Sequence, residues 1–166
     1  MSAPTPHEDL LSLLTTTLER EGATANAVTE CLDRILAAFD CVVGTVHCLN
    51  PSTELLELVA QRGVPNALLE RIDRIPIGKG MAGLAAERRE PVQVCNLQTD
   101  DSGVAKPRAK ETRMEGSISL PMLVGDELAG TLGVAKPVSY DFTPAEATRL
   151  LEIGSLLGSR FLTARS

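Results

Sequence analysis

Two helical patterns fill the first part of the chain. Between residues 8 and 21 the leucines recur at helical spacing, at positions 10, 11, 13, 14 and 18, and Gly22 ends the pattern. Thr24 is a suitable N-cap for a second helix that runs to Phe39. Its apolar positions repeat at i, i+3, i+4 and i+7, namely Ala27, Val28, Cys31, Leu32, Ile35, Leu36 and Phe39. We therefore expect two amphipathic helices in succession.

Runs rich in Val, Leu and Thr then predict two β-hairpins. Residues 41–49 and 54–61 are separated by the turn formers Asn50, Pro51 and Ser52. Residues 116–124 and 127–136 form the second pair, joined across Gly125 and Asp126. A further strand is expected at residues 91–95.

Short helices and one extended segment complete the pattern. A short helix follows Pro65, residues 74–77 are extended, and an alanine-rich helix covers residues 81–89. A final helix begins with Thr143 as its cap and Pro144 at its first position. The resulting order is ααββαβαβββα, without a repeat or linker. We predict one α+β domain, in which the terminal helices cover one face of a sheet and the middle segment covers the other.

The second hairpin predicts two unlike faces. One is bulky, with Ile118, Leu120, Met122, Val124, Leu128, Leu132 and Val134, and we expect it to pack on the terminal helices. The other is small, with Ser117, Ser119, Ala129, Thr131, Gly133 and Ala135. A small face leaves volume that must be filled. Either a ligand fills it, or the alanines Ala82, Ala85 and Ala86 pack tightly against it, and both alternatives stay open.

Residues 96–113 carry charge, Gly, Pro and Ser without an apolar period. Loops of this length in a compact domain are usually functional or mobile, so we expect a lid or a wall of a pocket. Arg108, Lys110 and Arg113 could give it a positive rim for an anionic ligand. The alternative is an ordinary solvated loop.

Charge and composition exclude several function classes. The net charge is −6, and the chain has one Tyr, three Phe and no Trp, so it lacks both the positive field and the stacking surface that nucleic acid requires. The N-terminus has neither a basic start nor a long apolar run, so we expect no membrane contact and a cytoplasmic location. No metal-ligating pattern is present, and His47 is expected to be a strand residue. The cysteines have no disulfide or zinc spacing and are expected to be reduced thiols: Cys31, Cys41, Cys48 and Cys95.

Three short strings, taken in order, resemble the GAF domain family. They are IGKGMAG at 77–83, PVQVCNL at 91–97 and SISLPM at 117–122. The resemblance implies a PAS-related, profilin-like fold with a central antiparallel sheet, terminal helices on one face, and a ligand pocket or its remnant on the other. It also implies a homodimer through the terminal helices. The expected division is an N-terminal helix at 1–23 that contributes to dimerisation, a GAF domain at 24–162 and a tail at 163–166.

Two functional branches of the GAF family match this chain poorly. The branch that reduces free methionine-R-sulfoxide carries a cysteine in a G-x-G-V-C-G string, whereas this chain has Ala82 at that position. Cyclic-nucleotide GAF domains carry N-K-x-F-x-x-x-D-E, of which only Lys136, Phe142 and Glu146 remain. We expect Lys136 and Glu146 to form an ion pair instead.

The glycines at 78, 80 and 83 match the dinucleotide fingerprint in letters, but no strand-turn-helix unit surrounds them, so they are interpreted as turn glycines.

The leading hypothesis is a non-catalytic sensor of a small molecule, acting in signalling through a downstream protein partner. No cofactor is identified and no catalytic residue or metal ligand is assigned. The alternatives are a GAF-fold interaction module without a ligand and, with less support, a thiol enzyme that uses Cys95. The candidate ligand-binding residues are Met81, Cys95, Arg113, Ser117, Ser119 and Thr131.

Overall fold

The computed structural model describes residues 3–105, 110 and 112–165. Two helices open it, α1 (Pro6–Glu21) and α2 (Ala25–Phe39). At the start of α1 the Thr5 hydroxyl accepts a hydrogen bond from the Glu8 amide at 3.1 Å, and the Glu8 carboxylate accepts one from the Thr5 amide at 2.8 Å. This reciprocal pair satisfies donors that a helix start leaves free. Thr24 caps α2 as predicted, with its hydroxyl oxygen 3.2 Å from the Ala27 amide.

The sheet is antiparallel throughout the described residues. Its strands are β1 (Val43–Asn50), β2 (Leu55–Arg62), β3 (Arg74–Pro76), β4 (Val92–Val94), β5 (Ser117–Val124) and β6 (Glu127–Ala135). Their order across the sheet is β3-β2-β1-β6-β5-β4, so the pairing of β1 with β6 lies at its centre, between the β1–β2 and β5–β6 pairings. The remaining helices are α3 (Asn66–Ile72), α4 (Gly80–Arg88) and α5 (Pro144–Arg165). The predicted order of helices and strands and the predicted α+β class are confirmed.

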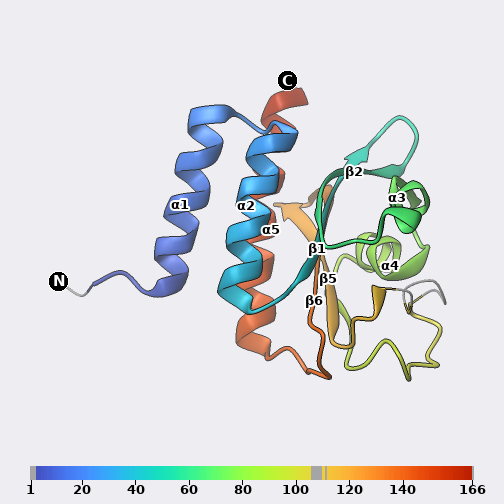
Figure 1. Ribbon diagram of the computed structural model, residues 1–166. Coiled ribbons are helices and arrows are strands. Elements are labelled where there is room, and N and C mark those ends of the chain that lie inside the picture. Colours follow the sequence, from blue (N-terminus) through green and yellow to red (C-terminus); the bar gives the residue numbers. More distant parts are fainter. Residues whose placement is uncertain (1–2, 106–109, 111, 166) are drawn as a thin grey trace.

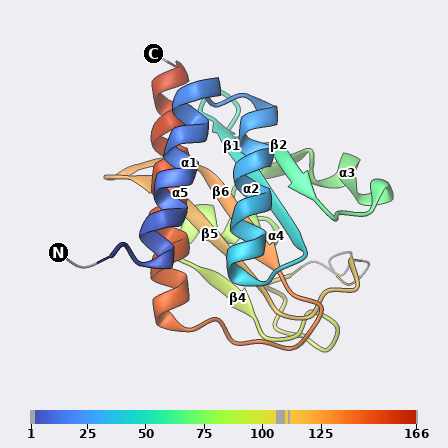
Figure 2. The same ribbon diagram turned by 60° about the vertical axis from the view of Figure 1, so that its left-hand side comes forward.

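The elements are stacked in layers, as Figures 1 and 2 show. α2 and α5 cover one face of the sheet, and α1 lies on these two helices rather than on the strands. α3 and α4 lie on the opposite face. The main core fills the space between the sheet and α2 and α5, and it includes Leu32, Ile35, Ile118, Leu132 and Ile153. No helix in the described ranges is both long enough and apolar enough to cross a bilayer.

The predicted faces of the second hairpin hold only as far as a β-bulge. The pairing of β5 with β6 moves from Met122–Gly130 to Leu123–Leu128, so Ala129 is an extra residue on β6. Beyond the bulge, the side chains of β6 point to the opposite face of the sheet from the one that a regular alternation would give them. Leu128 packs with Leu56 and Ala86 on the side of α4, although it was predicted for the bulky face. Ala129 lies against Gly158 of α5, although it was predicted for the small face.

The glycines of α5 contact the sheet. In the sequence, Gly154 and Gly158 are four residues apart in the last helix, a spacing that predicts close approach to another helix, from the same chain or from a twin. A β-carbon added at Gly154 would lie 3.3 Å from the Met122 side chain, and one at Gly158 would lie 3.0 Å from Ala129. That expectation is wrong for these glycines, because they let α5 approach β5 and β6 closely.

Lys136 does not pair with Glu146 as predicted. Its side chain is buried, and its ammonium group donates hydrogen bonds to the carbonyl oxygens of Phe39 and Asp40, at the C-terminal end of α2. The same group lies 4.5 Å from the centre of the Tyr140 ring. Lys136 therefore joins the end of β6 to the end of α2, where main-chain carbonyls carry partial negative charge.

Candidate functional site

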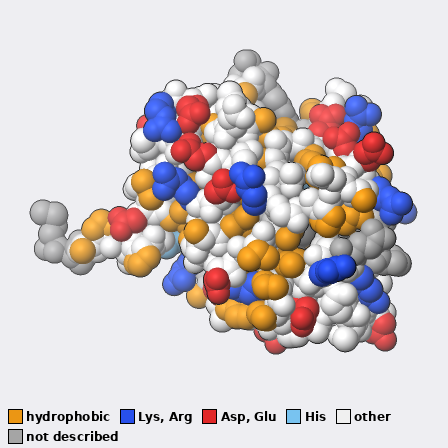
Figure 3. All heavy atoms as spheres, viewed as in Figure 1, with side chains coloured by type: hydrophobic (Ala, Val, Ile, Leu, Met, Phe, Trp, Pro, Cys, Tyr) orange, Lys and Arg blue, Asp and Glu red, His pale blue; other side chains and the backbone are white. Residues whose placement is uncertain are grey.

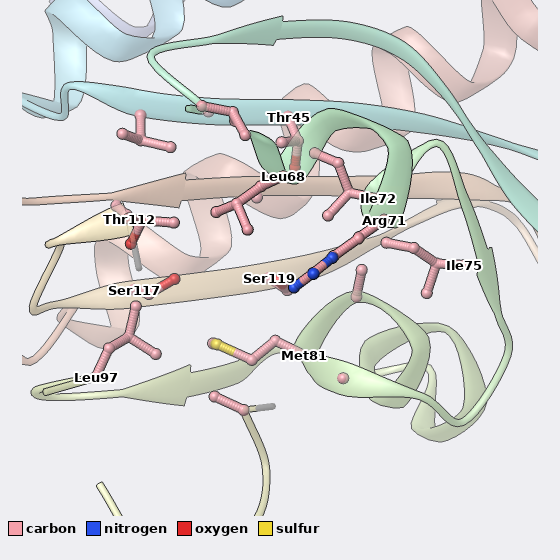
Figure 4. Close-up of a pocket in the computed structure, with 18 of the residues that line it drawn as sticks. Thr45, Leu68, Arg71, Ile72, Ile75, Met81, Leu97, Thr112, Ser117 and Ser119 are labelled. Carbon is pink, nitrogen blue, oxygen red and sulfur yellow. The ribbon is translucent and has the colours of Figure 1, made fainter. Parts of the chain in front are cut away.

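A cavity of about 220 Å³ lies on the face of the sheet opposite α2 and α5 (Figure 4). Its floor comes from β1, β5 and β6, and its walls come from α3, β3, the start of α4 and the 96–113 segment. A cavity of about 150 Å³ is enough to hold benzene, and drug-sized ligands need about 300 Å³ or more. The size therefore suits a small metabolite better than a nucleotide or a tetrapyrrole.

Small residues on three neighbouring strands create this space. Thr45 of β1, Gly133 of β6 and Ser119 of β5 follow one another across the sheet. A β-carbon added at Gly133 would lie 3.1 Å from the Thr45 hydroxyl oxygen and 3.4 Å from that of Ser119. Gly133 thus opens directly onto the cavity, and the hydroxyl groups stand on both sides of it. Ser117, from the same strand as Ser119, also lines the floor.

The small face is filled by an alanine at one end of the sheet and is open to the cavity at the other. Near Leu128, Ala86 of α4 is buried against the strands and fills the face. At the Gly133 end the helix no longer covers the sheet, and of the three alanines Ala82, Ala85 and Ala86 only Ala82 is part of the described cavity lining. The bulge at Ala129 separates the filled end from the open end.

α3 supplies the opposite wall and is held to the sheet by few contacts. Leu68 and Ile72 line the cavity, and Leu68 is the buried residue of the helix. The imidazole of His47, on β1, makes a hydrogen bond through Nε2 to the Ile72 carbonyl oxygen at 2.8 Å. The Leu58 amide also donates to the Asp73 carbonyl oxygen at 2.9 Å. The end of α3 is therefore fixed to β1 and β2, while its start has no side-chain cap.

Positive charge gathers at the cavity, and it comes from residues that the sequence did not single out. Arg71, Arg74 and Lys79 line it from α3, β3 and the turn before α4. The part of the lining that the structure describes contains no Asp or Glu. On the molecular face shown in Figure 3, by contrast, Lys and Arg side chains lie among Asp and Glu side chains. The signal for Arg71 was its place at i+3 from Leu68 in a short helix, which puts both side chains on one face.

The 96–113 segment does form part of the wall, as expected. Its described residues contribute Leu97, Ala105 and Thr112 to the lining. The side-chain amide of Gln98 donates to the Met114 carbonyl oxygen at 2.7 Å and to that of Lys110 at 3.2 Å, which ties the two ends of the segment together. Arg108, predicted for a positive rim, lies outside the described residues.

The predicted ligand-binding residues fall into two groups. Met81, Ser117 and Ser119 line the cavity, and Figure 4 shows the Met81 side chain directed into it. The other three are outside the lining: Cys95 and Arg113 are exposed, and Thr131 is buried beside His47. Thr45, Leu68 and Arg71 were not predicted, because Thr45 stands alone as a small polar residue on β1 and the other two lie on a helix of seven residues.

The turn glycines behave as interpreted from the sequence. Gly78 and Gly80 have φ angles of 92° and 66°, which favour glycine, and a β-carbon at Gly83 would lie 2.6 Å from the Pro76 carbonyl oxygen. The segment is a tight turn into α4, and it brings Lys79 and Met81 to the cavity.

The described cysteines lie away from the cavity lining. Burial raises the pKa of the Cys31 and Cys41 thiols to about 11, which disfavours the thiolate. Cys95 is exposed, and its carbonyl oxygen accepts a hydrogen bond from the Tyr140 amide. Over the described ranges, no cluster of three or more His, Cys, Asp or Glu residues could hold a metal ion.

The pH dependence of stability should report on His47, which is buried. Burial lowers the pKa of His47, so the unfolded chain binds this proton more tightly than the folded chain. Neutral His47 therefore makes its full contribution to the free energy of unfolding above the ordinary histidine pKa of about 6.5. As the pH falls below that value, the free energy of unfolding decreases by at most about 1.4 kcal/mol per pH unit. His47→Gln does not titrate. We expect urea unfolding of the two proteins to show a difference in stability that shrinks on acidification to about pH 5, and parallel curves would contradict this.

Comparisons with known proteins agree on one family. A family model described as GAF domain matches residues 24–160. The GAF domain of the phosphoenolpyruvate-protein phosphotransferase from Acinetobacter has a TM-score of 0.78 at 16% identity, covering 98% of this chain and 97% of that one. The GAF domain of the same kind of enzyme from Coxiella burnetii has a TM-score of 0.77 at 19% identity, covering 97% of each. No curated protein matches the chain.

An enzyme shares the fold as well. Free methionine-R-sulfoxide reductase from Neisseria meningitidis, solved in complex with its substrate, has a TM-score of 0.73 at 18% identity and covers 99% of this chain and 95% of that one. At these identities the solved structures establish the fold and leave the chemistry of the site to be argued from its own residues.

Proposed function

Because the chain belongs to the GAF domain family, we propose that it is a non-catalytic module that binds a small molecule in the cavity and signals to another protein. The observation that carries the proposal is the unfilled volume at Gly133. Protein interiors are packed closely, so a cavity of about 220 Å³ lined by apolar groups and hydroxyls is a candidate binding site.

The chemistry of the described cavity lining supports a non-catalytic role. At the position where the resemblance to the reductases requires a cysteine, Ala82 faces the cavity. The described lining contains no cysteine, histidine or carboxylate, so it offers neither a thiolate nor a general base. Its groups can bind and orient a ligand through hydroxyls and cations.

A bound ligand would act first on α3. This helix forms one wall, and the side chain of His47 joins it to β1 by a hydrogen bond. A ligand that contacts Leu68 and Arg71 would favour one position of α3 over others, and an ensemble shifts only by such differential contacts. We propose that a separate protein detects this change in the position of α3.

Homodimerisation through the terminal helices remains part of the proposal. α1 already packs on α2 and α5 within one chain, burying Leu10, Leu14 and Leu18. A dimer would therefore use the outward side of α1, where Leu13 is exposed, together with the free flanks of α2 and α5. Native mass spectrometry of freshly purified protein reports the oligomeric state and any co-purified small molecule in one measurement.

Gly133→Val tests the cavity directly. The added methyl groups enter the space between Thr45 and Ser119, so we expect small-molecule binding to fall at least about tenfold while the fold persists. Binding is measured by ligand-detected NMR with a metabolite mixture, and folding by thermal unfolding. Gly133→Ala is the matched control, since one methyl group fits with small side-chain shifts.

Ser119→Leu fills the same space from the neighbouring strand and serves as the second variant if Gly133→Val fails to fold. Unchanged binding of every metabolite in both filled variants would overturn the proposed function.

A further inference from the structure

Resting on the proposed function, we propose that the ligand is a small organic anion with an apolar body, held at its charged end by Arg71. The cavity is lined by Arg71, Arg74 and Lys79, and no carboxylate is found in the described part of its lining. A site with this charge distribution favours an anion over a neutral or cationic molecule of the same shape.

Arg71 is the best placed of the three cations to contact a ligand inside the cavity. Figure 4 shows its side chain extending from α3 into the space between Leu68 and Met81. Over the described ranges no ion pair joins it to an Asp or Glu. A cation in the last turn of a helix also interacts with the helix dipole, but that interaction does not require the guanidinium group to point into the cavity.

Guanidinium is suited to this task, because its planar donors bind a carboxylate or phosphate through two parallel hydrogen bonds. Arg71, Arg74 and Lys79 are all exposed residues of the lining, so the positive charge lies at the mouth of the cavity, where it attracts an anion. The charged end of the ligand therefore lies toward α3 and the mouth.

The rest of the cavity fits an apolar group. Leu68, Ile72, Ile75, Met81 and Leu97 face the interior, and the Thr45 and Ser119 hydroxyls flank Gly133 on the floor. Because the cavity has about 220 Å³, the apolar part of the ligand can be only slightly larger than benzene. Hydroxyls on the floor can accept or donate one or two further hydrogen bonds, which would select among anions of similar size.

Matched pairs of anionic and neutral probes test this inference. Butyrate, hexanoate and phenylacetate are each compared with the primary amide of the same skeleton, and phenyl phosphate is compared with phenol. Dissociation constants are measured by ligand-detected NMR for the wild type, Arg71→Gln and Arg149→Gln. Arg149 is exposed on α5, on the other face of the sheet, so its variant has the same loss of charge without a change at the cavity.

We expect the wild type and Arg149→Gln to bind at least one anion about tenfold or more tightly than its neutral partner, and Arg71→Gln to lose that preference. A preference within a carboxylate–amide pair indicates a carboxylate ligand, and a preference within the phenyl phosphate–phenol pair indicates a phosphate ligand. Equal affinities within every pair, or the same preference in Arg71→Gln and Arg149→Gln, would overturn the inference while the proposed function stands. If no compound, charged or neutral, binds the wild type better than Gly133→Val, both fail together.

Discussion

Replacing Gly130 with alanine is expected to lower the free energy of unfolding by about 3 kcal/mol or more. Gly130 lies on β6 beside the bulge and pairs with Cys48 of β1. A β-carbon there would lie 2.0 Å from the His47 carbonyl oxygen and 3.0 Å from its carbonyl carbon. These atoms belong to the backbone of a central strand, so no rotamer change relieves the clash. The strands must separate, and the hydrogen bonds of the β1–β6 pair weaken.

Gly133→Ala is the matched control for this variant. It adds the same methyl group to the same strand, but its nearest neighbours are two rotatable hydroxyl groups. We expect its stability to stay within about 0.5 kcal/mol of the wild type. Urea unfolding monitored by circular dichroism measures both variants. Similar stabilities for Gly130→Ala and Gly133→Ala would contradict the expected backbone clash.

Among the charged residues that the structure describes, Lys136→Met should be the most damaging change, with an expected loss of about 2–4 kcal/mol in the free energy of unfolding and a fall in Tm of about 8 °C. Methionine retains much of the apolar volume and removes the ammonium group. The carbonyl oxygens of Phe39 and Asp40 then lose a charged donor at the end of α2. The contact with the Tyr140 ring is lost as well.

Two companion variants make the Lys136 result specific. Lys110→Met removes an exposed charge and should change stability by less than about 0.5 kcal/mol. Glu146→Gln removes the partner that the sequence suggested, and it should cost less than Lys136→Met, because Glu146 accepts its hydrogen bonds from Tyr140 and Thr143 instead. A larger loss for Glu146→Gln than for Lys136→Met would contradict the assignment of Lys136 to the end of α2.

The elements of this fold could be predicted because each one follows a local rule. The stripe of α2 is buried at every predicted position, and Thr24 and the Gly125–Asp126 turn lie where their chemistry places them. The prediction for the faces of the second hairpin is wrong at Leu128, and the reason is physical. A bulge inserts one residue, here Ala129, and reverses the alternation beyond it, whereas the amino-acid pattern at the bulge looks like any other strand.

The candidate site could be predicted only in part. Ser117 and Ser119 follow from their small size on a strand that is otherwise bulky. Arg71 comes from a helix of seven residues, too short for a clear period, and it reaches the cavity because α3 lies over the same face of the sheet. The predicted partner of Lys136 is wrong, because its partners are main-chain carbonyl oxygens, and every residue type carries such a group.

The bulge at Ala129 also bears on how this protein could diverge among its descendants. On one side of it both faces of the β5–β6 hairpin are covered, by α4 and by α5, and on the other side the hydroxyl and glycine positions of one face line the cavity. Substitutions at the open end can accumulate without disturbing the packing at the closed end. The two halves of one hairpin are then free to drift at different rates, so a lineage can change what it recognises and keep the architecture that recognises it.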